Sequence, residues 1–309
     1  MVQLRSTGLA PATLSALRTL VLDTVASNHS RRVYAAALEQ FLAWYGSEPR
    51  GPLNKALLHR YRAALDAQGL GAVSINHRLT ALRKLAAEAA DNGLLDPQVA
   101  AGIARVKGLR PPGRRLGNWL SRPQAEQLLH WPDTHTLQGK RDQALLAVLI
   151  GCGLRRSEAA LLRCEQIQLR EGRWVIVDLV GKGQRLRSVA MPSWCQAALD
   201  SWTRAAAVTA GRLFRPIDKA GRVAGPGMSA HAVYAVVRRY TQQLGWNLAP
   251  HALRRTHAKL AFGGGARLEQ IQLSLGHVSV RTTERYLGVE QDWADAPCDH
   301  LGLRISPTE

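Results

Sequence analysis

Apolar residues recur at helical spacing along the first third of the chain. Leu14, Leu17 and Val21 lie on one face of such a period, and Tyr34 and Leu38 begin the next. Between residues 13 and 105 the period and its interruptions predict four to five helices. The first helix contains Leu14 to Val21, and the second starts from a cap at Asn28 or Ser30. The others run from Pro52 to Gly69–Gly71, from a cap at Ser74 to Asn92–Gly93, and from Pro97 onward. No strand pattern interrupts them, so we expect a small helical bundle.

Residues 106–118 break this period. The pair Pro111-Pro112 cannot continue a helix, and cationic residues surround it. We interpret the segment as an interdomain linker that follows a phosphate backbone, with a plain solvated loop as the alternative. Residues 1–105 then form a helical domain, and residues 119–309 form a second domain.

The second domain combines helical periods with one short β pattern. Apolar and β-branched residues run from Trp174 to Val180 and from Arg185 to Met191, on either side of a Gly181–Gly183 turn, which predicts a hairpin. The helical patterns cover 121–131 with Ser121 as the cap, 140–150, 192–207, 229–243, 250–262, 268–275 and 279–287, and a tail of about 289–309 follows. We therefore expect a mainly α-helical protein with a small β-sheet in its C-terminal domain.

The charge of the chain points to a polyanion as its partner. The 309 residues include 41 Lys and Arg against 23 Asp and Glu, a formal net charge of +18. Residues 1–110 carry 14 of these cations and 7 anions, and residues 111–309 carry 27 and 16, so both halves are basic. Most of the cations are arginines, whose planar guanidinium suits phosphate oxygens. Double-stranded DNA is therefore favoured over the alternative of a merely solvated basic surface.

The composition also excludes several classes of protein. No stretch approaches the roughly 20 apolar residues that a membrane helix needs, so no membrane partner is expected. The N-terminal residues lack the basic-then-apolar layout of a secretory signal. Cys152, Cys164, Cys195 and Cys298 lie far apart without a CxxC pair. We expect reduced thiols, a cytoplasmic location, and neither a metal nor a cofactor.

Two short clusters in the second domain contain residues that bind phosphate or move protons. In Gly153-Leu154-Arg155-Arg156-Ser157-Glu158, an arginine beginning a helical turn is followed at i+3 by a carboxylate that can fix it. Lys182 lies between two glycines at the hairpin tip, where a flexible loop can bring an ammonium to a substrate. Taken alone, the first cluster is better explained as a surface ion pair at a helix start, and the second as an idle lysine on a glycine-flanked turn.

Two further clusters lie towards the C-terminus. His251 and Arg254 are three residues apart at a helix start, so the imidazole and the guanidinium share a face beside N–H groups that favour an anion. Leu275-Gly276-His277 is followed by Tyr286, nine residues after the histidine. Unbroken helix would place His277 and Tyr286 on different faces, whereas a turn at 277–279 folds them towards one site.

In this order the four clusters resemble the tyrosine recombinases, or phage-integrase family, of site-specific DNA recombinases. The resemblance rests on GLRRSE around Arg155, GKG-x-R-x-R at Lys182, HALRRT from His251, and LGH with its tyrosine nine residues later, and covers about residues 118–290. The chain is similar to the compact, two-domain, Xer-like members. By position and helix count, residues 1–105 resemble the family's DNA-binding core-binding domain, and residues 119–309 resemble its catalytic domain. It departs from the family at Arg255, where histidine is frequent, and at His257, where an aromatic residue is frequent.

The resemblance implies a role for each residue. Arg155 and Arg254 clamp the scissile phosphate, His277 donates to the same oxygens, and Tyr286 attacks to form a 3′-phosphotyrosine link. An unperturbed phenol has a pKa near ~10, so it needs help to lose its proton. His251 is the candidate base, oriented by Glu158, and Lys182 is the candidate acid for the leaving 5′-oxygen. The scheme needs no cofactor or metal.

The resemblance also implies partners and alternatives. Strand exchange joins two double-stranded sites, so a homotetramer on DNA is expected, with a monomer or weak dimer in its absence. The reaction then serves integration, excision or resolution of DNA, as in mobile elements. A type IB topoisomerase, which uses the same chemistry without exchanging strands, is one alternative. A catalytically inactive DNA-binding regulator of the same fold is the other.

Overall fold

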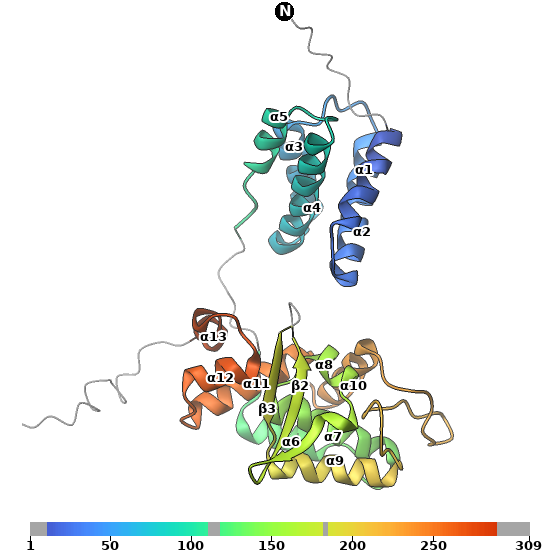
Figure 1. Cartoon of the computed structure of the whole chain (residues 1–309), viewed down its shortest axis with the longest axis vertical. Coiled ribbons are helices and arrows are strands. Elements are labelled where there is room, and N and C mark those ends of the chain that lie inside the picture. Colours follow the sequence, from blue (N-terminus) through green and yellow to red (C-terminus); the bar gives the residue numbers. More distant parts are fainter. Residues whose placement is uncertain (1–10, 111–117, 182–184, 289–309) are drawn as a thin grey trace, which may run out of the picture. The chain divides into compact units, whose positions relative to one another are not determined.

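The structure, a computed structural model, describes residues 11–110, 118–181 and 185–288. The chain divides into two compact units, with the division between Arg115 and Leu116 (Figure 1). Each unit has a hydrophobic core of its own. Lys182, Pro111-Pro112 and the tail 289–309 lie outside the described residues.

The first unit is the expected helical bundle. Its helices are α1 (Pro11–Asp23), α2 (Asn28–Gly46), α3 (Lys55–Ala67), α4 (Ala72–Asp91) and α5 (Pro97–Ala104). Helix α4 packs against the other four, and leucines on its buried face contact aromatic residues of α2 and α3 in one core. Short helices of this kind are held mainly by that apolar face rather than by their own propensity.

Two predicted helix starts in this unit are wrong by a few residues. Ser27, rather than Asn28 or Ser30, caps α2, because its hydroxyl accepts the N–H of Ser30. Helix α4 begins at Ala72 after Gly71, so Ser74 lies inside it rather than at its cap.

The start of the expected linker belongs to the first unit. Val106 is only 1% exposed, and the side chain of Asn76 on α4 bonds both the N–H and the carbonyl of Leu109, each at 2.9 Å. Residues 106–110 therefore pack along α4, and the remainder of the expected linker, from 111 to 117, lies outside the described residues.

The second unit is built around one buried helix. Helix α7 (Leu137–Gly151) packs against α6 (Arg122–His130), α8 (Arg156–Leu161), α9 (Ser193–Ala205), α10 (Ala230–Gln243) and α11 (Pro250–Gly263). Its residues from Ala144 to Ile150 are all buried, as its apolar run predicts. Ser121 caps α6 in a capping box, as expected. Helix α7 begins three residues before the expected Lys140 because Thr136 caps it.

A three-stranded antiparallel sheet in the order β1-β2-β3 completes the second unit (Figure 1). The predicted hairpin is present as β2 (Arg173–Val180) and β3 (Leu186–Ala190), whereas β1 (Ile167–Arg170) was not predicted. The register shifts between Ile176 and Leu179, where Asp178 has a φ of 53°. Such a bulge bends a strand, here just before β2 ends at Val180.

The last two helices are α12 (Leu268–Leu275) and α13 (Val280–Leu287), and they pack on α11 and on each other. The expected fold class, mainly α-helical with a small sheet in the C-terminal unit, is confirmed. Within the described ranges, we find no helix with the length and apolar character needed to cross a membrane.

Candidate active site

Arg155 is presented by a tight turn between α7 and α8. Gly153 has a φ of +60°, and a Cβ there would lie 2.8 Å from the ring of His257. Only glycine combines that backbone conformation with so close an approach. The His257 ring in turn bonds the carbonyl of Ile150 through Nδ1 at 2.9 Å. The turn is thereby fixed against α11, and Arg155 follows it as the N-cap of α8.

Glu158 holds two arginines rather than the histidine. Its carboxylate accepts the Arg155 backbone N–H at 2.7 Å and the Arg155 Nη1 at 2.6 Å, as the i+3 spacing predicts. Arg187 on β3 donates a bidentate pair of hydrogen bonds to the same carboxylate, from Nη1 to Oε1 at 2.9 Å and from Nη2 to Oε2 at 2.8 Å. The expectation that Glu158 orients His251 is wrong, because these guanidinium groups and the Arg155 N–H occupy its oxygens.

The electrostatics of Glu158 follow from these contacts. Burial raises the pKa of its carboxyl, but the hydrogen bonds and charge of Arg187 and the hydrogen bonds from Arg155 outweigh burial and lower the pKa to about 2. Glu158 is therefore ionised at neutral pH and offsets part of the positive charge of the site.

Three arginines converge on the C-terminal end of α12. The Leu275 carbonyl accepts hydrogen bonds from Arg254 and, at 3.4 Å, from Arg155 Nη2, while the Ser274 carbonyl accepts from Arg187 Nε at 2.8 Å. Unsatisfied carbonyls and the negative end of the helix dipole favour cations there. Arg254 also donates to the Gly153 carbonyl at 2.5 Å. It is 1% exposed, and burial followed by the charge of Arg155 lowers its pKa to about 10.

His277 follows directly after these carbonyls. Gly276 ends α12 in the left-handed conformation, with a φ of 61°, and turns the chain so that His277 faces α13. The Nδ1 atom of His277 lies 3.0 Å from the hydroxyl of the buried Thr283. Burial, then the charges of Arg254 and Arg155, lower the His277 pKa to about 4. The imidazole is therefore neutral at pH 7, with Nε2 not engaged by Thr283.

Tyr286 on α13 lies between the two histidines. Its ring centroid is 5.4 Å from that of His277 and 5.4 Å from that of His251, with edge-to-face geometry at both. The predicted turn therefore brings His277 and Tyr286 together. The Tyr286 hydroxyl donates to the backbone carbonyl of His251 at 3.3 Å. Burial raises the Tyr286 pKa, and the charges of Arg254, Arg255 and Arg155 oppose that shift.

The pKa of His251 favours its neutral imidazole at pH 7. Burial lowers its pKa, and the charges of Arg254, Arg255 and Arg155 lower it further. A neutral imidazole has one free nitrogen lone pair, which a base requires.

Lys182 lies outside the described residues, but the residue before it is described. A Cβ built on Gly181 would lie 3.7 Å from Arg155 Nη1 and 3.5 Å from Arg187 Nη1. The hairpin thus begins its turn beside the arginine cluster.

Sequence reasoning missed the structural roles of three residues. Arg187 appears in the GKG-x-R-x-R pattern, but its partner Glu158 is 29 residues away. His257 bonds a carbonyl 107 residues away. Arg255 places its guanidinium carbon 4.9 Å from the Tyr286 ring centroid. The signal available in the sequence was the departure at 255 and 257, which marked the positions without indicating their contacts.

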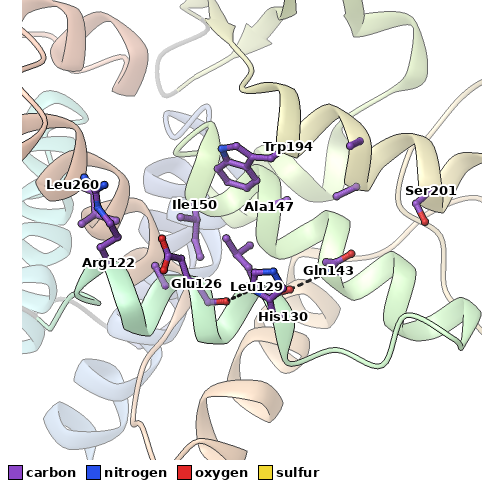
Figure 2. Close-up of a pocket in the computed structure, with 13 residues that line it drawn as sticks. Arg122, Glu126, Leu129, His130, Gln143, Ala147, Ile150, Trp194, Ser201 and Leu260 are labelled. Atoms are coloured by element: carbon purple, nitrogen blue, oxygen red, sulfur yellow. Dashed lines mark hydrogen bonds between the residues drawn. The ribbon is translucent and has the colours of Figure 1, made fainter.

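A cavity of about 690 Å³ lies elsewhere in the second unit. It lies between α6, α7, α9 and α11, and Figure 2 shows Trp194 and Ile150 on its wall with Leu260 at one end. None of the candidate residues lines it. Its lining is mainly apolar, whereas a sugar–phosphate backbone needs cations and hydrogen-bond donors. We therefore assign the site to the arginine–histidine–tyrosine cluster.

Replacing Glu158 by glutamine should destabilise the second unit at pH 7 by about 3–5 kcal/mol, because two cations lose a largely buried partner. The folded pKa of about 2 lies below the ordinary 4.5, so the parent loses this stabilisation as the pH falls from 4.5 towards 2. The difference in the free energy of unfolding between Glu158→Gln and the parent should therefore decrease over that range. Urea unfolding at pH 7, 4 and 3 measures it.

Glu165→Gln is the matched control, since Glu165 pairs with Arg163 at the surface and both side chains are about half exposed. Its unfolding midpoint should stay near that of the parent. If Glu158→Gln differs from the parent by the same free energy of unfolding from pH 7 to 3, the lowered pKa of Glu158 is contradicted.

Comparisons with known proteins give consistent matches over both units. The model of the phage integrase family matches residues 118–292, and that of the phage integrase N-terminal SAM-like domain matches residues 15–93. Tyrosine recombinase XerC of Xylella fastidiosa (strain M23) is 32% identical over 265 residues, which cover 84% of this chain and 86% of the relative. A tyrosine recombinase of Synechococcus elongatus is 30% identical over 302 residues, or 91% of each chain.

Solved structures share the fold at low sequence identity. The XerH site-specific recombinase bound to a palindromic difH substrate, in a post-cleavage complex, has a TM-score of 0.67 at 19% identity, over 92% of this chain and 82% of that one. A lambda integrase (75–356) dimer bound to a COC′ core site has a TM-score of 0.67 at 13% identity, over 96% and 97%.

Proposed function

Because the chain belongs to the phage integrase family and is a tyrosine-type site-specific DNA recombinase, we propose that it cuts and rejoins DNA through a covalent bond from Tyr286 to a 3′-phosphate. The observation that carries this proposal is the Tyr286 ring lying between His251 and His277, next to arginines that share the Leu275 carbonyl. A nucleophile, a base and cationic donors are the groups that phosphoryl transfer requires.

The arginines bind the scissile phosphate. A phosphodiester repels nucleophiles, and fixed cations on its non-bridging oxygens relieve that repulsion. Arg155 exposes 30% of its side chain and is accessible to DNA in this conformation. Arg254 is buried, so it reaches the phosphate after a local rearrangement around it. His277, neutral and held by Thr283 at Nδ1, donates from Nε2.

The chemical step then removes one proton from the attacking phenol and delivers another to the leaving oxygen. The Tyr286 oxygen attacks the phosphorus and gives its proton to His251, whose lowered pKa keeps the imidazole neutral beforehand. The bond from phosphorus to the 5′-oxygen breaks, and Lys182 protonates that oxygen. A 5′-hydroxyl from another strand reverses the same steps, so the phosphotyrosine bond conserves the energy of the broken ester.

Both units contribute to binding double-stranded DNA in this proposal. The supporting observations are the excess of basic residues in each half and the two matched domain families. The helical unit binds the duplex next to the cut site, and the second unit carries out the reaction. The XerH and lambda integrase structures contain DNA. Joining two duplex sites requires four strands to be cut, so the assembly on DNA is a tetramer of this chain.

The two alternative functions are not favoured. The curated relatives are named tyrosine recombinases rather than topoisomerases. An inactive regulator is at odds with the intact residue types at all six candidate catalytic positions, Arg155, Lys182, His251, Arg254, His277 and Tyr286.

Covalent capture tests the proposal. The protein is incubated with a library of duplex DNA in excess chelator, denatured, and the attached DNA is sequenced. We expect adducts at a defined sequence, with the nucleotide on the peptide that contains Tyr286, and an undiminished yield in chelator. Adducts on another residue, or a requirement for added magnesium, would contradict the mechanism.

A further inference from the structure

Arg255 occupies an unusual place beside the proposed nucleophile. It lies one helical turn after His251 on α11, and its guanidinium carbon is 4.9 Å from the centre of the Tyr286 ring. Its Nε atom is buried and has no hydrogen-bond partner among the described residues. Within the same ranges, Arg255 has no ion pair with a carboxylate. Its charge is therefore directed at an aromatic ring rather than at an anion.

We propose that Arg255 is a positioning residue for strand cleavage, which holds the Tyr286 ring by a cation–π contact and favours the ionised phenol with its permanent charge. The proposal rests on the proposed function of Tyr286. A guanidinium stays protonated at any working pH, whereas the histidine that is frequent at this position in the family does not. A partly desolvated cation over a ring attracts the electron-rich face, and more strongly once the oxygen is negative.

The charged and titratable groups that face Tyr286 come from two helices and one turn. Arg254, Arg255 and His251 are on α11, Arg155 is the N-cap of α8, and His277 lies in the turn between α12 and α13. Burial raises the pKa of the phenol, and the three arginines oppose it.

These arginines differ in what they already bind. Arg155 and Arg254 donate to the Leu275 carbonyl, and Arg155 also pairs with Glu158. In the proposed mechanism both then take the scissile phosphate, whose negative charge offsets theirs. Arg255 has no such partner among the described residues, so its charge remains available to the phenol when DNA is bound.

The test is the pH dependence of single-turnover cleavage by Arg255→Met, Arg255→Lys and the parent, on the DNA site found by covalent capture. We expect Arg255→Met to be slower by about tenfold at pH 7, the size of a partly desolvated cation–π contact. Its rate should keep rising to a higher pH than that of the parent. Arg255→Lys should retain most of the rate. Arg222→Met removes an equal charge from an exposed loop residue paired with Asp218, and should match the parent.

A second measurement separates ionisation from structure. A fluorinated tyrosine, whose phenol is more acidic, is placed at position 286 in Arg255→Met, and we expect it to restore the rate at pH 7. Arg255→Gln serves if Arg255→Met unfolds. A slow variant with the parent's pH profile and no restoration, or a variant identical to the parent, would overturn the role of Arg255. Absence of the adduct from the parent itself would instead contradict the proposed function.

Discussion

Replacing Tyr286 by phenylalanine should abolish the covalent protein–DNA adduct while leaving folding and DNA binding intact. The hydroxyl makes a 3.3 Å hydrogen bond to the His251 carbonyl, and a single neutral bond of this kind contributes about 1 kcal/mol or less. The ring and its edge-to-face contacts with both histidines remain. The expected result is therefore a band shift on a native gel, as for the parent, and no adduct on a denaturing gel.

An adduct that persists in Tyr286→Phe would move the nucleophile to Tyr234 or Tyr240. Tyr240 is a poor candidate, because its hydroxyl bonds the buried Asp142 at 2.9 Å, and burial followed by the charge of Asp142 raises its pKa to about 12. Tyr234→Phe is the matched control on α10, and should form the adduct normally.

Replacing Lys182 by alanine should slow cleavage of ordinary DNA by roughly 10²–10⁴-fold, the usual contribution of a general acid. Position 181 lies beside Arg155, so the end of β2 lies next to the proposed site of the phosphate. If the ammonium protonates the departing 5′-oxygen, replacing that bridging oxygen by sulfur removes the need for an acid, since a thiolate leaves readily without a proton. Single-turnover rates of Lys182→Ala on the sulfur-bridged substrate should therefore approach those of the parent.

Arg155→Ala provides the contrast. Its charge is needed whatever the leaving group, so this variant should stay slow on both substrates. Arg254→Ala should behave in the same way. Equal impairment of Lys182→Ala on ordinary and sulfur-bridged DNA would make the lysine a phosphate clamp instead of an acid, with Arg185 as the next candidate for the proton.

Periodicity in the sequence predicted most elements because each buries one apolar face. It located α12 and α5 at the ends they have in the structure, since Gly276 and Pro97 mark those ends unambiguously. Strand β1 was not predicted because it has only four residues, and the last two of them, Leu169 and Arg170, are exposed. The predicted start of α4 was wrong because Ser74, the better capping residue, lies two residues inside the helix. The residue at the actual N-cap, Gly71, has no side chain that could mark it.

The types of the candidate site residues were visible in the sequence, but their partners were not. The i+3 spacing of Arg155 and Glu158 predicts their ion pair, which is a local contact. Arg187 reaches the same carboxylate from strand β3, and three arginines donate to the carbonyls of Ser274 and Leu275. Every residue has a backbone carbonyl, so the residue types do not reveal which carbonyls accept these hydrogen bonds. The position of α12 in the structure is needed to identify them.

The convergence of arginines on the end of α12 also sets the order in which activity arises during synthesis. Arg254 depends on carbonyls at positions 153 and 275, and the tyrosine follows at 286. Domains emerging from the ribosome generally fold from the N-terminal end. The helical unit, complete by residue 110, thus has its core before the cluster exists. A nascent chain, or one cut short before α12, holds three arginines without the Ser274 and Leu275 carbonyls and without the proposed nucleophile. The ability to break DNA is therefore acquired last, when nearly all of the described chain has been made.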